Sequence, residues 1–394
     1  MSAPVKVAPS GSAVALLAPD REDPPAFERG ALAAKRFHAS MPGYRPTVLR
    51  NSPVAASRLG VAEVLVKDES KRLGLPSFKV LGASYAVYRA ILDRLGASAE
   101  EIPTFERLHK EVGRLRPLSL SAATDGNHGR AVARMAALLE LGCDIYVPAN
   151  TVRARIEAIE SEGAAVTVID GGYDDAVARS ATDAGDSCLV ISDTSWDGYE
   201  QVPGWVIEGY STVFAEIEGA IKGDGRRRPD VVAVPIGVGA LAASVVRHFW
   251  TAPGPRPKIL GVEPTSAACV LESVAAGKIV TLEHPQDSIM AGLNCATPSL
   301  IAWPLVSRGI DVYVAVEDER VPDAMRLLAR DRIVAGETGA AGLAGMLALI
   351  EEDDLASGRS ALRISSTSSV LLLCTEGATD PDAYRRLTSD SGQL

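Results

Sequence analysis

The chain has no long hydrophobic run. Of its 394 residues, 47% are hydrophobic and 23% are charged, proportions that are typical of a water-soluble protein. A membrane-spanning helix needs roughly 18 or more consecutive apolar residues, and no stretch of the sequence comes near that length. We therefore expect no membrane-spanning segment.

Positive charge is also scarce. Lys and Arg number 40 against 50 Asp and Glu, which gives a net charge of −10. The one short basic stretch, "GRRRP" at 225–229, is typical of a loop. Because nucleic-acid binding depends on a basic surface, the sequence argues against DNA or RNA as a partner and favours small ligands.

Cysteine is rare and scattered. The five cysteines show no CxxC spacing, and the N-terminus lacks the basic, apolar and small-residue regions of a secretion signal. These absences predict a cytoplasmic protein without a metal site. Their spacing leaves open whether Cys269 and Cys295 pair.

What the sequence does contain is a regular alternation of strand and helix patterns. From about residue 117 onward, apolar runs such as "CDIYVPA" and "SVLLLCTEG" alternate with amphipathic stretches such as "GRAVARMAALLELG". This rhythm predicts an α/β fold with largely parallel sheets, covered by helices on both faces, and ligands at the carboxyl ends of the strands. The chain is too long for one hydrophobic core, so we expect two domains, each with three layers.

A single lysine stands in an uncharged stretch, "PSFKVLGASY" at 76–85. Its neighbours Phe78, Val80, Leu81 and Tyr85 predict that Lys79 is partly buried, where an amine needs a partner. Two interpretations are open. The amine is held for Schiff-base chemistry, or the side chain reaches solvent along an apolar helix face.

Two glycine-containing loops follow predicted strands and open predicted helices. In "ATDGNHGR" (123–130) the helix N-terminus suits a carboxylate or phosphate, although Asp125 could instead cap the helix. In "PIGVGALAAS" (235–244), Gly237 and Gly239 let the backbone approach an anion. This loop lacks the Gly-Lys-Ser/Thr of a P-loop and the third glycine of a dinucleotide fingerprint, so it suits one monophosphate.

A third polar loop, "CTEGATD" at 374–380, follows the last apolar strand, where Thr375 points a hydroxyl into a site or caps a turn. One lysine among apolar neighbours, one loop suited to a phosphate and several polar loops at strand ends suit pyridoxal phosphate (PLP). The lysine would hold the aldehyde of this cofactor and the glycine loop its phosphate.

At this point the sequence resembles the tryptophan-synthase-like, fold-type II PLP enzymes, and within them the diaminopropionate ammonia-lyases. Nine motifs in family order carry the resemblance over about residues 40–385: "SFKVLGASYA", "ATDGNHGR", "YDDAV", "DTSWDGY", "PIGVGA", "GVEP", "IMAGLNC", "AGETGA" and "CTEG". The resemblance implies a large domain of residues 1–83 and 207–394, a small domain of residues 84–206 inserted in it, and a cofactor between the two domains.

The resemblance also implies roles for individual residues. Lys79 would bind the cofactor aldehyde, Asn127 its phenolic oxygen and Thr375 its ring nitrogen. The remaining cofactor-binding residues would be Phe78, Gly237, Val238, Gly239, Ala240, Leu241, Gly292 and Glu337, with Ser77, Thr124, Asp125 and Asp193 on the substrate side.

Asp125 sets the chain apart from serine and threonine dehydratases of this fold, which usually show a neutral serine at this position. A carboxylate there suits a substrate with a second, basic nitrogen, and it can accept a proton when desolvated. Asp193, in "DTSWDGY", matches a second catalytic base of the lyases, which acts on the opposite enantiomer. The alternative is that Asp193 caps the turn that follows.

The sequence thus predicts a PLP-dependent carbon–nitrogen lyase of amino-acid metabolism, which removes the α-proton of D- or L-2,3-diaminopropionate and expels the β-amino group, giving pyruvate and ammonia. A homodimer is the family expectation. The alternatives are a serine, threonine or other β-hydroxy amino-acid dehydratase, a β-replacing synthase, and, in a different class, a non-catalytic regulator that binds PLP or an amino acid. The run "AGLNCATPS" differs from the "GLACGEPN"-like run of the family, so another β-substituted amino acid is also compatible with the sequence.

Overall fold

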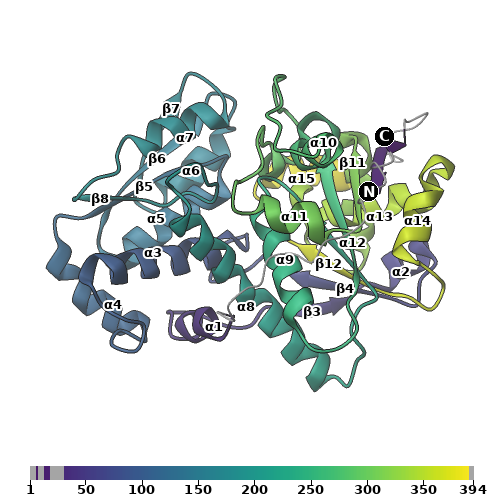
Figure 1. The fold of residues 1–394 in the computed structure, drawn as a ribbon, viewed down its shortest axis with the longest axis horizontal. Helices are drawn as coiled ribbons and strands as arrows, with labels where there is room; N and C mark the ends of the chain where they lie inside the picture. Colours follow the sequence, from purple (N-terminus) through teal and green to yellow (C-terminus); the bar gives the residue numbers. More distant parts are fainter. Residues whose placement is uncertain (1–5, 8–12, 18–30, 390–394) are drawn as a thin grey trace. The chain divides into compact units, whose positions relative to one another are not determined.

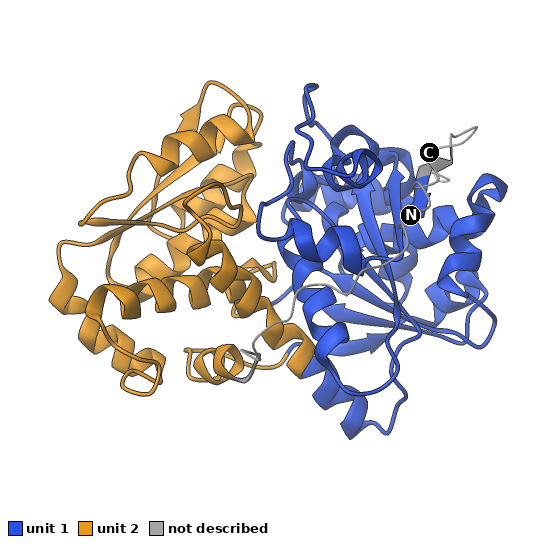
Figure 2. Cartoon of the chain, in the orientation of Figure 1, with its two compact units in different colours: residues 1–27, 47–71, 216–394 blue, residues 28–46, 72–215 orange. Residues whose placement is uncertain are grey.

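The computed structural model describes residues 6–7, 13–17 and 31–389. The chain divides into two compact units (Figure 2). Unit 1 comprises residues 1–27, 47–71 and 216–394, and unit 2 comprises residues 28–46 and 72–215.

Unit 1 is built on an eight-stranded sheet with the strand order β1-β2-β11-β10-β9-β12-β4-β3, of which β3, β4, β11 and β12 are labelled in Figure 1. The five strands from β11 to β4 are parallel, and β1, β2 and β3 pair antiparallel at the edges. Every residue of β9, β11 and β12 is buried, as expected of parallel strands covered on both faces. The strands are β1 (Lys6–Val7), β2 (Ala13–Leu17), β3 (Leu49–Asn51), β4 (Glu63–Asp68), β9 (Val231–Pro235), β10 (Lys258–Pro264), β11 (Val312–Val316) and β12 (Ser369–Cys374).

The central helix of unit 1 is α13, which contacts β9, β10, β11 and β12. It is apolar around almost its whole circumference. Gly345 lets it approach the sheet closely, because a Cβ there would lie 2.5 Å from Cγ2 of Val262. The helices of this unit are α2 (Pro53–Leu59), α9 (Ala240–Thr251), α10 (Cys269–Ala276), α11 (Trp303–Gly309), α12 (Val321–Arg330), α13 (Glu337–Glu351), α14 (Ala356–Leu362) and α15 (Pro381–Thr388).

Unit 2 contains a four-stranded parallel sheet with the order β7-β6-β5-β8. Its strands are β5 (Ser119–Ala123), β6 (Gly142–Pro148), β7 (Ala165–Ile169) and β8 (Cys188–Val190). The order reverses after β7, so right-handed crossovers place α5 and α6 on one face and α7 on the other. The helices are α1 (Ala31–Ala39), α3 (Lys79–Leu95), α4 (Phe105–Glu111), α5 (Asn127–Leu139), α6 (Arg153–Glu160) and α7 (Tyr173–Ala181).

The last helix of unit 2, α8 (Gln201–Gly223), begins in this unit and ends in unit 1. Within unit 2 it packs closely on α3. A Cβ on Gly82 would lie 2.5 Å from the Tyr210 ring, and one on Gly209 would lie 2.5 Å from the carbonyl oxygen of Leu81. Both glycines therefore permit the close approach of α3 and α8.

The predicted α/β fold with largely parallel sheets is confirmed. The limits of the two units, however, differ from the predicted domain boundaries. A boundary after residue 83 would cut α3, which packs along its length on α5 and stays in unit 2. A boundary after residue 206 would cut α8 before Tyr210, which packs against Phe78 of the same unit. No helix in the described part of the chain has the length and apolarity to span a membrane.

Candidate active site

Lys79 is the first residue of α3. The Ser77 hydroxyl accepts a hydrogen bond from the Lys79 backbone N–H at 3.4 Å. The Lys79 side chain is 17% exposed, whereas Val80 and Leu81, which follow it, are buried. The predicted partial burial of Lys79 is confirmed, and the partner that such a buried amine needs is Asp193, whose Oδ2 lies 2.5 Å from Nζ.

Asp193 lies just beyond the end of β8 and is 5% exposed. Its Oδ1 accepts a hydrogen bond from the Tyr173 hydroxyl at 3.1 Å, and its Oδ2 lies 3.9 Å from Nδ1 of His128. The turn after β8 is capped by Ser192, whose hydroxyl accepts from the Thr194 N–H at 3.2 Å. The Asp193 carboxylate instead faces a lysine, a tyrosine and a histidine.

The lysine and the aspartate stabilise each other's charges. Burial works to raise the pKa of Asp193, but the Lys79 ammonium and His128 outweigh it and hold this pKa well below its usual range. Burial likewise works to lower the pKa of Lys79, and Asp193, with Tyr210 and Asp125, holds it well above its ordinary value. In this structure the pair is therefore an ammonium and a carboxylate.

Asp125 lies in the turn between β5 and α5 and is half-buried. Burial is the main cause that raises its pKa, and the Lys79 and Arg155 cations only partly offset it. The helix begins at Asn127 with Gly126 as its N-cap and without a side-chain cap, so the alternative that Asp125 caps α5 is wrong. Asp125 is therefore a half-buried carboxyl whose proton affinity is increased, which suits a proton acceptor.

The backbone of this turn requires a glycine. Gly126 has φ of +148° and ψ of −71°, and a Cβ there would lie 3.0 Å from Cδ of Arg155. The Thr124 hydroxyl accepts a hydrogen bond from the Gly126 N–H at 2.8 Å and holds the turn. Because the N-cap residue is a glycine and has no side chain to cap the helix, the N-terminus of α5 can bind a carboxylate.

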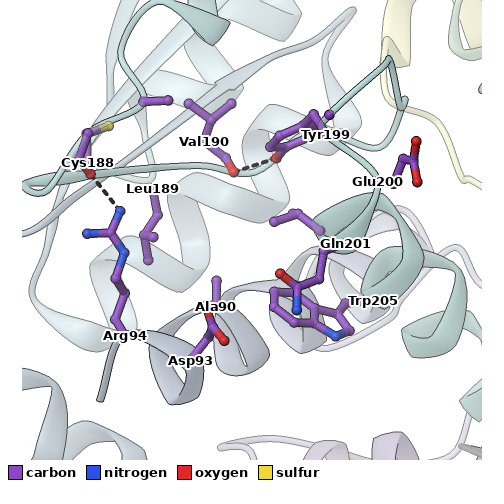
Figure 3. A pocket seen from close by; sticks show the side chains of 14 residues that line it. Ala90, Asp93, Arg94, Cys188, Leu189, Val190, Tyr199, Glu200, Gln201 and Trp205 are labelled. Atoms are coloured by element: carbon purple, nitrogen blue, oxygen red, sulfur yellow. Dashed lines mark hydrogen bonds between the residues drawn. The ribbon is translucent and has the colours of Figure 1, made fainter. Parts of the chain in front are cut away.

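Tyr199 holds the carboxyl end of β8. Its hydroxyl donates to the carbonyl oxygen of Val190 at 2.6 Å and accepts from the Ser192 N–H at 3.2 Å, and its ring stacks on Trp196 at 4.2 Å between centroids. Figure 3 shows the bond to Val190 at the edge of a cavity of about 250 Å³ lined from α3, β8 and the start of α8. Lys79 and Asp193 do not line this cavity, so Tyr199 supports Asp193 from outside the candidate site.

In unit 1, the glycine loop after β9 packs tightly against the segment around Gly292. A Cβ on Gly237 would lie 3.1 Å from the Gly292 carbonyl oxygen and 3.2 Å from Sγ of Cys295. Gly239 has φ of +96° and is the N-cap of α9, without a side-chain cap. The structure thus gives residues 237–241 the form that a phosphate-binding helix N-terminus requires.

The other predicted residues of unit 1 lie at two element ends. Gly292 donates its N–H to the Thr338 hydroxyl at 3.2 Å, and Glu337, next to Thr338, is 5% exposed at the start of α13. Thr375 follows β12 and is 3% exposed. Within the described residues its hydroxyl is buried and has no hydrogen-bond partner.

These features fit pyridoxal phosphate. A buried hydroxyl without a partner is costly in a folded protein, and the Thr375 hydroxyl suits the ring nitrogen of the cofactor. The loop of Gly237–Leu241 suits the phosphate. Unit 2 supplies the amine of Lys79 and the carboxylates of Asp125 and Asp193.

Sequence reasoning missed three residues around Lys79 and Asp193. Tyr173 and His128 contact Asp193, and the Tyr210 hydroxyl is buried without a hydrogen-bond partner in the described part of the chain. Tyr173 and His128 belong to motifs that carried the family resemblance, "YDDAV" and "ATDGNHGR", which was the available signal. Tyr210 lies within a helical stretch that gave none.

Replacing Gly237 should weaken cofactor binding. A valine there would push the loop away from the Gly292 carbonyl and Cys295, displacing the N–H groups that we assign to the phosphate. We expect Gly237→Val to raise the Kd for PLP by about tenfold or more, measured by absorbance titration of the purified protein. The matched control is Gly219→Val, because a Cβ at Gly219 meets no atom within 4 Å. Unchanged affinity with an intact circular-dichroism spectrum would rule the loop out as the phosphate site.

Comparison with known protein families agrees with this geometry. Residues 41–366 match the family described as pyridoxal-phosphate dependent enzyme. The chain belongs to this family and has the fold of its fold-type II members, with PLP as its cofactor. The family and the fold class predicted from the sequence are confirmed.

Diaminopropionate ammonia-lyases are among the relatives that the chain resembles over nearly its whole length. The chain is 34% identical over 374 residues to the enzyme of that name from Escherichia coli K12, and the matched region covers 93% of each chain. The holo crystal structure of the Escherichia coli enzyme has a TM-score of 0.89 and 32% identity, covering 96% of this chain and 97% of the other. A complex of the Escherichia coli enzyme with an aminoacrylate-PLP azomethine reaction intermediate has a TM-score of 0.85 and 32% identity, covering 95% of both.

Proposed function

We propose that this protein is a PLP-dependent ammonia-lyase that eliminates the β-amino group of 2,3-diaminopropionate and yields pyruvate and ammonia. The observation that carries the proposal is the pair of carboxyls near Lys79. Asp193 is buried and directly contacts the amine, and Asp125 is half-buried and close enough to raise the pKa of Lys79. Their pKa values shift in opposite directions. The relatives named diaminopropionate ammonia-lyase support the same reaction.

When bound, PLP withdraws electrons from the α-carbon of the amino acid and so makes its proton removable. We assign the aldehyde to Lys79, the phenolic oxygen to Asn127 and the ring nitrogen to Thr375. A hydroxyl carries no charge, so Thr375 does not hold a proton on that nitrogen as a carboxylate would, which favours loss of a β-substituent over transamination. Residues 237–241 bind the phosphate, and Phe78, Gly292 and Glu337 complete the cofactor site.

The substrate carboxylate is assigned to the N-terminus of α5. Backbone groups of Thr124 to Asn127 surround this end of the helix, and the helix dipole favours an anion there. Ser77, which immediately precedes Phe78 and Lys79, lies on the substrate side. Holding the carboxylate fixes which face of the α-carbon each aspartate can reach.

Asp125 and Asp193 act as the two proton acceptors. The α-protons of the D- and L-isomers point to opposite sides when both carboxylates occupy the same helix end, so one base does not serve both. Asp125 is assigned to the D-isomer and Asp193 to the L-isomer. The proposal includes a homodimer in the cytoplasm, on the basis of the family resemblance.

A panel of amino acids tests the substrate assignment. Purified protein loaded with PLP should release pyruvate from 2,3-diaminopropionate at least about tenfold faster, in kcat/KM, than it releases the corresponding oxo acid from serine, threonine or 3-hydroxyaspartate. A faster reaction with any hydroxy amino acid would make the protein a dehydratase. No turnover of any of them would favour the non-catalytic regulator.

The enzyme should lose its activity toward the two isomers at different pH values. A general base works only when it is unprotonated, so activity falls as the pH falls through its pKa. Because the pKa of Asp125 is raised and that of Asp193 is lowered, kcat/KM for the D-isomer should decline at a higher pH than kcat/KM for the L-isomer. Measurements from about pH 4 to pH 8 would test this, and superimposable acid limbs would contradict the assignment of one base to each isomer.

A further inference from the structure

His128 is buried at the start of α5 and is held in one orientation. Its side chain is 2% exposed, and its Nε2 lies 2.7 Å from the carbonyl oxygen of Ile191. A carbonyl oxygen only accepts hydrogen bonds, so Nε2 is the nitrogen that carries a proton. This contact fixes the His128 ring next to Ile191, which follows β8 and precedes Asp193 by two residues.

The other ring nitrogen faces Asp193. Nδ1 lies 3.9 Å from Asp193 Oδ2 and, within the described residues, is buried without a hydrogen-bond partner. A buried acceptor without a partner is unfavourable unless something uses it. The nearest carboxylate is the one that we assign to the L-isomer.

The same oxygen of Asp193 faces both Lys79 and His128. In the structure Oδ2 bonds to the Lys79 ammonium, while Oδ1 remains with the Tyr173 hydroxyl. Nδ1 and an ionised Oδ2 are both acceptors, so the two atoms can hydrogen-bond only after Oδ2 has taken up a proton, with Oδ2 as the donor. The titratable groups around this pair are Lys79 on α3, Asp125 in the β5–α5 turn, Tyr173 on α7, Tyr199 after β8 and Tyr210 on α8.

We propose that His128 is a positioning residue that takes over the proton collected by Asp193. After Asp193 accepts the α-proton of the L-isomer, that proton passes from Oδ2 to Nδ1. The transfer restores the Asp193 carboxylate and leaves an imidazolium whose Nε2–H still bonds to the Ile191 carbonyl oxygen. This inference rests on the proposed function, because it takes Asp193 as the base for the L-isomer.

The kinetic test replaces His128 with glutamine, which can still donate to the Ile191 carbonyl oxygen but presents no ring nitrogen to Asp193. His128→Gln in the holoenzyme should lower kcat for the L-isomer by about 10–100-fold and change kcat for the D-isomer by less than about threefold. His109→Gln is the matched control, since His109 lies on α4 and pairs with Glu140. Equal losses on both isomers would show that His128 only supports the fold.

The spectroscopic test leaves His128 in place. The chain has five histidines, so ¹⁵N-histidine NMR of the holoenzyme can follow each ring, with His128→Gln assigning the signal. We expect a proton on Nε2 of His128, and we expect the titration of Nδ1 to change in Asp193→Asn, because Nδ1 faces that carboxylate. An unprotonated Nε2, or a titration that Asp193→Asn does not move, would overturn the proposal.

The two tests separate this inference from the function on which it rests. If Asp193→Asn slows both isomers alike, the assignment of Asp193 to the L-isomer fails, and the relay fails with it. If Asp193→Asn slows the L-isomer selectively but the His128 titration does not move, only the His128 inference is wrong.

Discussion

Lys79→Ala should reduce turnover of diaminopropionate by more than about 10³-fold, because the variant lacks the amine to which we assign the covalent bond with the cofactor. The variant should also lose the visible absorbance of the lysine-bound cofactor and release PLP on dialysis. Absorbance spectra and pyruvate release from the purified protein measure both effects. This is one of the two largest effects that we expect from a single substitution.

Two further variants distinguish the loss of covalent bonding to the cofactor from the loss of the ion pair between Lys79 and Asp193. Lys79→Arg keeps a cation beside Asp193 but supplies no amine for covalent bonding, so it should fail as completely as Lys79→Ala. Lys71→Ala removes an exposed lysine a short distance upstream and should leave both spectrum and turnover unchanged. A retained absorbance band in Lys79→Ala that resists dialysis would show that another residue binds the cofactor.

Replacing each aspartate in turn with asparagine should reduce turnover of one isomer and largely spare the other. Asp125→Asn should lower turnover of D-diaminopropionate by about 10²–10⁴-fold and affect the L-isomer much less, and Asp193→Asn should do the reverse. Asparagine keeps the size of the side chain but does not accept a full proton. Steady-state pyruvate release from each pure isomer gives the two ratios directly.

Asp193→Asn has a second consequence, since it also removes the carboxylate that stabilises the Lys79 ammonium. The absorbance of bound PLP should therefore be recorded for both variants, so that loss of cofactor is not mistaken for loss of a base. Equal losses on both isomers in both holo variants would mean that the aspartates bind the second amino group or maintain the site. The base would then be another residue, such as Lys79 itself.

Local patterns in the sequence were enough to predict the sheets and the loops that follow them. Several parallel strands are almost wholly apolar because both of their faces are buried, and the sequence shows this in the runs of β9, β11 and β12. The glycines of residues 237–239 marked a tight turn into α9, and the structure places Gly239 in the left-handed region. Such features depend on neighbours in the chain.

Contacts between distant residues were not predictable in the same way. Lys79 and Asp193 are separated by 114 positions, and only the path of the chain from α3 to the end of β8 brings them together. The orientation of His128 depends on the Ile191 carbonyl, 63 positions away. The unit limits also depend on packing, since α3 and α8 continue past the points at which the sequence suggested boundaries.

The most direct test of the account is the ratio of ammonia to pyruvate released from 2,3-diaminopropionate by the purified, PLP-loaded protein. Elimination of the β-amino group followed by hydrolysis releases two molecules of ammonia for each pyruvate, with water as the only other reactant. Our account predicts this ratio, and it predicts that Lys79→Ala abolishes both products. Absence of pyruvate from both isomers in protein that holds PLP on Lys79, or equal activity in Lys79→Ala, would contradict it.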